Sequence, residues 1–316
     1  LEGSYFSSNK NIDETGSVVN LLSTNQFNEM RAELRASYDF TDSFSVFADL
    51  TFKRTNSTTL GLDRINWNFG DQTIGADALI YSGVVNVIPE ISVTIPAYVA
   101  PGTDNAVLVG NGAIAATGRL YVTKSIGKFL LVPSAGFRYR TQGFCSQMPW
   151  EALGHLDVGR NFFAEAWVNG ALTVLDDQYV LTPTTRKQIT DLYDGGSYMY
   201  DAVNPSWVSA GGRIGYRVSS DLFVSVAGEQ VLTGLRVAYG TKIFVGIGFS
   251  EIMGAPDGST HYRSSKIQNT RRGEEKIDSG KFQEDTTSED SALQDDEMTL
   301  KRVKVKDGKK YVKPVR

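Results

Sequence analysis

The feature that most constrains this chain is a repeated alternation of apolar and polar residues with a period of two. Between Phe44 and Phe52 every even position is apolar, and every odd position except Phe47 is polar. Successive side chains of a β-strand point to opposite faces, so this pattern predicts strands that have one apolar and one polar face.

Twelve segments of this kind can be distinguished in the first 249 residues. They cover residues 2–10, 28–40, 43–54, 73–82, 85–97, 113–124, 127–140, 152–159, 162–175, 206–218, 220–232 and 239–249. Five connections are short, near 41–42, 83–84, 125–126, 160–161 and 219, whereas 11–27, 55–72, 98–112, 141–151, 176–205 and 233–238 are longer. Tight turns at one end and longer loops at the other are typical of bacterial outer-membrane β-barrels.

Three details favour an apolar face that points outward into lipid. Several segments span 11–14 residues, whereas soluble strands usually have about 5–6 and a bilayer needs about 9–11. The polar face carries charges of both signs, as a wet lumen would. Aromatic residues of the apolar face gather near the short turns, as in a membrane-interface girdle: Tyr38, Phe40, Phe44, Phe129, Phe162, Tyr216 and Phe249. A soluble β-sandwich or lipocalin-like barrel is the alternative.

The polar face supplies the candidate functional residues. We expect a lumen constriction near mid-height, formed by Glu33, Arg35, Asp49, Arg119, Asn169 and Arg213. We expect the outer mouth to carry Lys53, Arg138, Arg140, Glu229 and Lys242. Side chains just fill the interior of a barrel of about eight strands, whereas a barrel of about sixteen strands leaves a channel. A barrel of twelve strands can therefore be closed and braced by paired charges, or it can contain a constricted pathway. Loop 176–205, with Tyr193, Tyr198 and Tyr200, is a candidate lid.

Composition excludes several other classes of protein. The single Cys145 excludes an internal disulfide and a multi-cysteine metal site. A net charge of −4 does not suggest nucleic-acid binding, and we expect no cofactor or metal. His155, Asp157 and Ser134 raise the alternative of a hydrolase, but no nucleophile motif accompanies them, so an enzyme is not expected. The glycines of residues 211–215 lack the strand-to-helix context of a phosphate loop and instead allow close approach of neighbouring chains or bulky side chains.

The last 67 residues differ from the rest. Residues 284–297 contain seven acidic side chains and no Lys or Arg, and residues 301–316 contain eight basic ones against Asp307. Such segments bury too little apolar surface to offset chain entropy. We therefore expect a barrel domain over 1–249 and a largely disordered, charged periplasmic tail over 250–316, with a hairpin about Asp307-Gly308. The tail would either aid solubility or dock on an acidic periplasmic or envelope partner.

A family resemblance adds to this interpretation. The run from Tyr38 to Phe47 resembles the strand–turn–strand of outer-membrane proteins in the phenol-degradation MetA-pathway family, which is related to the FadL-like transporters. The strand ending at Ile95-Pro96, residues 136–140 and residues 234–240 are similar to its later strands. The resemblance covers about 27–249 and implies uptake of small hydrophobic compounds. It departs from the family pattern in lacking an evident FadL-type hatch domain and in its charged tail.

The sequence therefore predicts an all-β, antiparallel transmembrane barrel of about twelve strands in the bacterial outer membrane, surrounded by outer-membrane lipid. The first functional hypothesis is passive passage or uptake of small molecules through a charge-lined lumen. The second is a scaffold barrel that anchors an assembly through its tail. Leu1-Glu2-Gly3 shows no signal-peptide pattern, so we expect the chain to start as a mature or trimmed form.

Overall fold

The computed structural model describes residues 1–22, 24–59, 61–98, 107–159, 161–178, 197–200, 202–219, 222–249, 302–306 and 309–313. The chain divides into two compact units, Leu1–Thr270 and Arg271–Arg316. The first contains a large β-barrel, and the second contains a two-stranded hairpin.

Twelve strands form the wall of the barrel. They are β1 (Glu2–Ile12), β3 (Gln26–Thr41), β4 (Phe44–Thr59), β6 (Asp71–Ala78), β8 (Asn86–Pro96), β9 (Ala115–Ile126), β10 (Phe129–Arg140), β11 (Ser146–Val158), β12 (Phe162–Leu175), β13 (Ser206–Arg217), β14 (Leu222–Leu235) and β15 (Val237–Phe249). Each pairs antiparallel with the next, and β1 pairs with β15, from Glu2 opposite Gly246 to Ile12 opposite Val237. This last pairing closes the sheet into a barrel.

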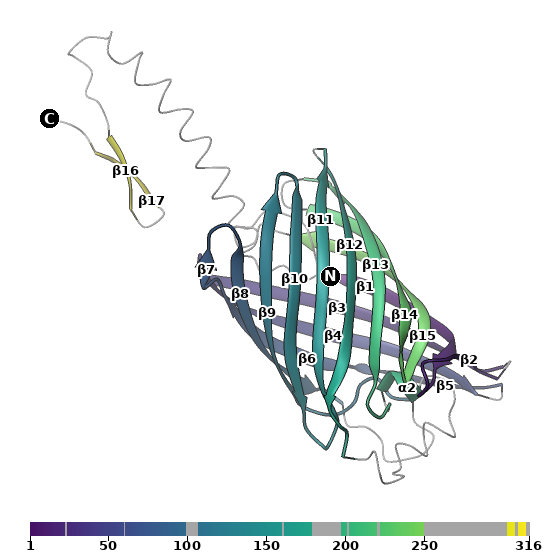
Figure 1. Ribbon diagram of the computed structural model, residues 1–316. Coiled ribbons are helices and arrows are strands. Elements are labelled where there is room, and N and C mark those ends of the chain that lie inside the picture. The colour runs from purple at the N-terminus through teal and green to yellow at the C-terminus, as the bar shows by residue number, and fades with distance from the viewer. Residues whose placement is uncertain are drawn as a thin grey trace, which may run out of the picture. The chain divides into compact units, whose positions relative to one another are not determined.

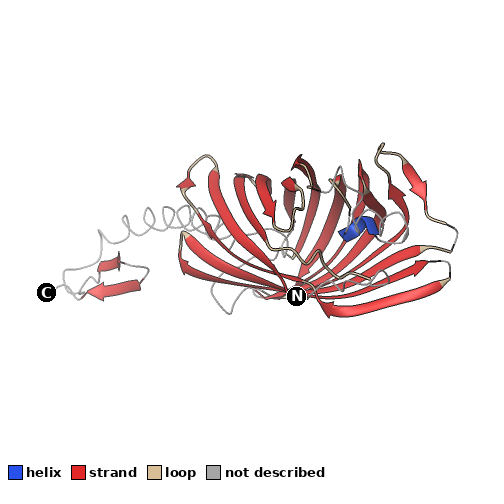
Figure 2. Cartoon of the chain, turned by 90° about the horizontal axis from the view of Figure 1, so that it is seen from below, coloured by secondary structure: helices blue, strands red, loops and turns tan. Residues whose placement is uncertain are grey.

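Three shorter strands and one short helix complete this unit. Strand β2 (Val18–Asn20) pairs with β1, β5 (Leu62–Phe69) with β4, and β7 (Tyr81–Ser82) with β8. Strands β9–β13 in front cross β1, β3 and β4 behind them, as the two walls of a tilted barrel do (Figure 1). In Figure 2 strands make up most of the drawn barrel, and helix α2 (Ser197–Tyr200) is its short helix. No helix in the described part of the chain is long and apolar enough to cross a membrane.

The predicted architecture is confirmed, with three local differences. Strand β5 lies where a loop was expected at 55–72, and it extends the β3–β4 hairpin. Strand β11 begins at Ser146 rather than near residue 152. The loop predicted at 233–238 is reduced to Arg236, whose positive φ of 52° turns the chain tightly from β14 into β15.

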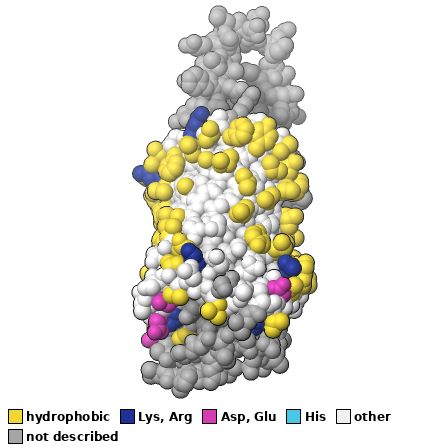
Figure 3. Space-filling model, turned by 90° about the vertical axis from the view of Figure 1, so that its right-hand side faces the viewer, with side chains coloured by type: hydrophobic (Ala, Val, Ile, Leu, Met, Phe, Trp, Pro, Cys, Tyr) yellow, Lys and Arg dark blue, Asp and Glu magenta, His cyan; other side chains and the backbone are white. Residues whose placement is uncertain are grey.

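The apolar face of the strands points outward and the charged face points inward. Ile91, Ile214 and Val245 are 70%, 63% and 59% exposed, whereas Glu165 and Arg213 are 4% and 2% exposed. Figure 3 shows apolar side chains spread over one face of the barrel. A soluble protein has the opposite arrangement, so this surface fits lipid and the soluble alternative is wrong.

All seven aromatic residues expected in the girdle are exposed on the outer surface. Tyr38 and Phe40 have ring centroids 4.8 Å apart, and Phe162 and Tyr216 are 4.9 Å apart. These rings lie near the short turns, where a membrane interface would meet the barrel. Their role at that interface stays a prediction.

The second unit contains the hairpin that the sequence predicts. Strands β16 (Arg302–Lys306) and β17 (Lys309–Lys313) pair antiparallel, with Lys306 opposite Lys309. The hairpin is therefore confirmed. Its turn, and the prediction of disorder for the rest of 250–316, lie outside the described residues.

Candidate functional site

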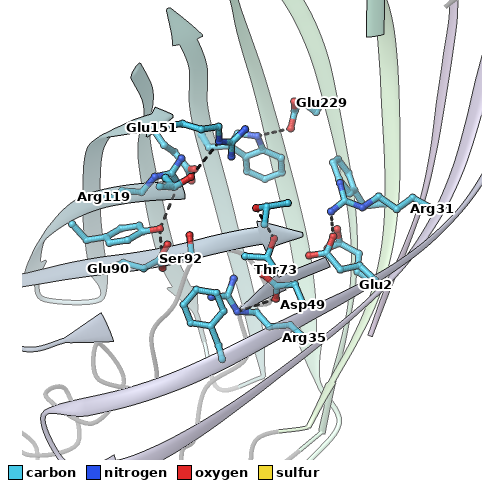
Figure 4. Close-up of a pocket in the computed structure, with 18 of the residues that line it drawn as sticks. Glu2, Arg31, Arg35, Asp49, Thr73, Glu90, Ser92, Arg119, Glu151 and Glu229 are labelled. Atoms are coloured by element: carbon cyan, nitrogen blue, oxygen red, sulfur yellow. Dashed lines mark hydrogen bonds and ion pairs between the residues drawn. The ribbon is translucent and has the colours of Figure 1, made fainter. Parts of the chain in front are cut away.

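The barrel encloses a cavity of about 310 Å³, which we call the charged chamber. Side chains from β1, β3, β4, β6, β8–β12, β14 and β15 line it: Glu2, Arg31, Glu33, Arg35, Phe47, Asp49, Thr73, Glu90, Ser92, Thr94, Thr117, Arg119, Tyr121, Arg138, Glu151, Trp167, Glu229, Lys242 and Phe244. Five of these are basic and six acidic, and Figure 4 shows labelled members from several strands around a common space. The chamber is therefore a polar compartment inside an apolar shell.

The basic side chains on β3 have acidic partners close by. Arg31 forms an ion pair with Glu33 on the same strand. The guanidinium of Arg35 lies 3.6 Å from Asp49 on β4 and 4.3 Å from the ring centre of Phe47. Register explains the second pair, because Arg35 and Asp49 lie directly opposite each other. The residue that broke the alternation in the sequence, Phe47, thus faces inward as a support for Arg35.

The far wall of the chamber combines acidic and aromatic groups. Trp167 Nε1 donates to Glu229 Oε2 at 3.1 Å, and Ser209 Oγ donates to Glu229 Oε1 at 2.7 Å. The rings of Trp167 and Phe244 meet edge to face at 6.4 Å. Tyr121 donates to Glu90 at 3.4 Å. Figure 4 places Glu229 and Glu151 on this side, away from Arg35 and Asp49.

Toward the short turns an apolar cluster lies inside the barrel. Ile88, Leu130, Val132 and Leu153 are at most 2% exposed and pack into one apolar cluster with the inner ends of Tyr121, Trp167, Ala227 and Phe244. A twelve-stranded barrel would otherwise leave a wider opening. The charged chamber therefore ends on an apolar floor at this side.

A buried polar network lies beside that floor. The two ring nitrogens of His155 lie 2.9 Å from Glu165 and 3.2 Å from Asp157. Arg217 donates to Asp157 at 2.6 Å, and Arg213 donates to Glu2 at 2.7 Å. Both nitrogens of His155 thus face carboxylates, which leaves neither to activate Ser134, a residue that lies opposite Glu151. This arrangement braces the wall and does not resemble a hydrolase triad.

Toward the long loops, helix α2 reaches the inner face of β3 and β4. Lys53 Nζ donates to the Tyr200 hydroxyl at 2.9 Å, and that hydroxyl donates to Glu29. Burial, and then the negative Glu29, raise the pKa of Tyr200 well above its usual value, so the hydroxyl keeps its proton. Met199 and Tyr200 also pack against Phe6, Phe27 and Ala238. These contacts hold α2 at the mouth of the barrel.

The structure distributes the predicted lumen residues differently from the sequence expectation. Glu33, Arg35, Asp49 and Arg119 line the charged chamber, but so do Arg138, Glu229 and Lys242, which were expected at the outer mouth. Lys53 donates to the hydroxyl of Tyr200 at 2.9 Å, and Arg140 donates to the carbonyl of Cys145 at 2.9 Å. Asn169 and Arg213 instead belong to the wall networks, where Asn169 Oδ1 lies 2.5 Å from Ser209 Oγ.

Several chamber residues were not singled out from the sequence. Arg31 and Glu90 lie on the polar faces of predicted strands, so the alternation could have found them. Glu151 was assigned to a loop, and Trp167 was not distinguished from its neighbours. Of the three tyrosines in the candidate lid, Tyr200 is among the described residues. The side chain of Tyr198 and the whole of Tyr193 lie outside them. No group of three or more potential metal ligands occurs among the described residues.

Comparison with known proteins bears on the fold. The sequence matches no protein-family model and no curated protein. Among solved structures, the chain resembles the COG4313 outer membrane channel from Pseudomonas putida F1, with a TM-score of 0.59 and 12% identity over 78% of this chain and 93% of that one. A weaker likeness to the KdgM porin has a TM-score of 0.44 and 7% identity over 79% and 99% of the two chains. The first likeness shows that the barrel has the fold of an outer-membrane channel.

Proposed function

We propose that this protein is an outer-membrane barrel that allows passive passage or uptake of small molecules through its lumen. The observation that carries the proposal is a closed barrel with an apolar exterior around a charged chamber. A chain that served only as a membrane anchor would not need eleven ionisable side chains around one internal cavity, because burying charge is costly unless it is used or paired.

Two similarities support this proposal, one in the fold and one in the sequence motifs. A solved structure with the same fold is described as an outer membrane channel. The sequence motifs resemble the MetA-pathway and FadL-like family, which suggests uptake of hydrophobic compounds. The chamber lining is mostly polar, however, so solutes that carry a polar or charged group fit it better than purely apolar ones.

We propose that passage through this barrel requires some movement, because an apolar cluster lies at one side of the chamber and α2 at the other. The apolar floor lies on the side of the short turns, and α2 lies on the side of the long loops. We propose that Tyr200, held by Lys53 and Glu29, fixes α2 in this closed position. Loop 176–205 would then act as a lid that opens when these contacts break.

Single-channel recording in planar bilayers tests both statements. The native protein is expected to conduct ions in discrete steps of low amplitude. Tyr200→Phe removes the hydroxyl that joins Lys53 to Glu29, and it is expected to lengthen the open periods. Ser219→Ala, in a short turn at the opposite end, is the control and should behave as the native protein. Folded native protein that shows neither conductance nor solute flux in liposomes would rule out passage, and unchanged gating in Tyr200→Phe would rule out the latch.

The scaffold hypothesis has one observation in its favour. The β16–β17 register brings Arg302 opposite Lys313 and Lys306 opposite Lys309, within a segment, residues 301–316, that carries eight basic residues and one acidic residue. An acidic partner would suit this excess of basic residues. In this alternative the tail over 250–316 lies in the periplasm and docks on an envelope component. Comparing partners co-purified with the full chain and with a chain that ends at Phe249 tests it; identical partner sets would exclude a docking tail.

A further inference from the structure

The acidic side of the charged chamber contains a carboxylate that has no counter-charge in contact. Glu151, on β11, lines the chamber and is only 5% exposed. No hydrogen bond or ion pair within 4 Å joins it to any residue in the described part of the chain. Buried carboxylates are normally paired, because desolvation of an unpaired charge is costly. The Glu151 carboxylate therefore faces the chamber without a hydrogen-bonding or charged partner in the described structure.

The groups around Glu151 indicate what kind of partner would fit. Glu151 lies opposite Asn169 on β12, and Trp167 is two residues further along the same inner face. Trp167 donates to Glu229 at 3.1 Å, so an indole and a second carboxylate line the same chamber as Glu151. Phe244 adds a second ring, 6.4 Å from that of Trp167. Carboxylates beside aromatic faces are the usual surroundings of a bound organic cation.

A second unpaired polar atom lies next to Glu151. Ser134 is directly opposite Glu151 on β10, and its Oγ is buried without a hydrogen-bond partner in the described structure. A hydroxyl can accept a hydrogen bond as well as donate one. Ser134 thus offers a further acceptor to an ammonium or guanidinium group held by Glu151.

None of the five basic residues that line the chamber forms an ion pair with Glu151 in the described structure. Arg119 donates to the Tyr121 hydroxyl at 3.4 Å, and its guanidinium lies 5.8 Å from the Tyr121 ring centre. Arg138 donates to Thr117 at 3.4 Å. Lys242 lies opposite Glu229 in the β14–β15 register, and its Nζ lies 4.5 Å from the ring centre of Phe244, so it flanks the Glu229 side of this wall and not Glu151. Arg31 and Arg35 face Glu33 and Asp49.

We propose that Glu151, Trp167 and Glu229 form a binding site for a small organic cation, such as a primary amine attached to an apolar or aromatic group. The ammonium group binds between the two carboxylates, and the attached group packs against Trp167 and Phe244. The proposal rests on the proposed function, since it names the class of solute that the lumen would take up. Binding and passage are nevertheless separate properties, so each can fail without the other.

Isothermal titration calorimetry on the folded, detergent-solubilised protein tests the site directly. The probes are benzylammonium, the neutral benzyl alcohol and the anionic benzoate, which share a ring and differ in charge. The native protein is expected to bind benzylammonium and to bind the other two at least about tenfold more weakly, as loss of a charge-assisted contact implies.

Two nearly isosteric variants assign the binding to this wall. Glu151→Gln and Glu229→Gln each remove one negative charge and should weaken benzylammonium binding at least about tenfold. Glu14→Gln, whose side chain pairs with Arg236 in an exposed loop, is the matched control and should bind as the native protein. Far-UV circular dichroism identifies the variants that retain the barrel. A further variant, Ser134→Ala, leaves both carboxylates in place and should weaken benzylammonium binding less than either Gln variant does.

The outcomes separate the two claims. Absence of benzylammonium binding by the native protein, equal binding of benzoate, or unchanged affinity in folded Glu151→Gln each overturns the cation site. Conductance in bilayers would still support passage in those cases. Conversely, selective binding that Glu151→Gln abolishes, in a barrel that never conducts, would support the site and reject passage.

Discussion

At the scale of single residues, glycines on the inner face make room for large side chains. A Cβ atom at Gly215 would overlap the ring of Phe163, and one at Gly211 would overlap the indole of Trp167. The sequence interpretation of residues 211–215 as close-approach glycines is therefore confirmed. Phe163 and Trp167 fill the barrel interior at 0% and 5% exposure because these glycines leave space for them.

Substituting such a glycine should destabilise the barrel. Gly215→Ala adds a methyl group against Phe163, and overpacking of this kind costs about 1–3 kcal/mol. Gly118→Ala is the control, because a Cβ atom there meets nothing within 4 Å. Urea unfolding in lipid vesicles, followed by tryptophan fluorescence, measures both variants. Equal midpoints for the two variants would contradict the packing account.

The acidic residue Glu151 is a site residue that the sequence did not predict. Residues 141–151 carry Gly143 and Pro149, which favour a loop, and so Glu151 was not assigned to a strand face. In the structure β11 starts at Ser146 and pairs fully with β12, including Pro149 opposite Ala171. The β10–β11 register shows no partners for Met148 and Pro149, so the missing proline N–H costs no hydrogen bond there. Residues 146–151 form a strand because they pair with β12, and the pattern of a single sequence does not show which segments pair.

At the scale of elements, long antiparallel hairpins are the part of the fold that the sequence predicts best. Strand β3 pairs with β4 from Gln26 opposite Thr58 to Thr41 opposite Phe44. Strand β5 was missed because Asp63-Arg64 and Asn66 interrupt its apolar residues. Its outward face nevertheless carries Ile65, Trp67 and Phe69 at 50%, 61% and 57% exposure, which continues the apolar surface of β4.

The closing pair of strands provides a test of register. Gly3 on β1 lies opposite Val245 on β15, and directly opposite residues have Cα atoms within about 5.5 Å, inside the range that a disulfide spans. In a Cys145→Ala background, Gly3→Cys with Val245→Cys should form a disulfide on mild oxidation. Electrophoresis without reductant, combined with peptide mass mapping, detects it.

The matched control shifts one cysteine by two residues along the same face. Gly3→Cys with Ile247→Cys should remain largely reduced, because diagonal partners are about 7–8 Å apart. Preferential cross-linking to position 247 would show that the barrel closes in another register.

At the scale of the whole molecule, the sequence predicts which residues face inward but not how high they lie. Strands of a barrel tilt and are staggered against their neighbours, so equal distances from a turn correspond to different heights. Arg138, Glu229 and Lys242 were expected at the mouth and instead line the same chamber as Arg35 and Asp49. The inward-facing charges were thus predictable, whereas their grouping around one cavity was not.

The lipid-facing surface predicts a position-dependent cost for added charge. Ile243 lies near the middle of β15 and is 53% exposed, whereas Val84 is 81% exposed in the turn before β8. Ile243→Arg should cost about 2–4 kcal/mol of unfolding free energy and Val84→Arg about 0–1 kcal/mol, because charge is most costly at the bilayer midplane. Folding titrations in vesicles give both values; the same small cost at both sites would mean that lipid does not surround β15.

The central claim is the orientation of the two strand faces, and spin-label accessibility along β14 in lipid vesicles tests it most directly. Single labelled cysteines replace four consecutive residues in a Cys145→Ala background. Val224 and Val226 are 39% and 55% exposed, and Ser225 and Ala227 are 8% and 6% exposed. The account predicts strong collisions with lipid-dissolved oxygen at positions 224 and 226 and weak ones at 225 and 227. The opposite alternation, or equal accessibility at all four positions, would contradict it.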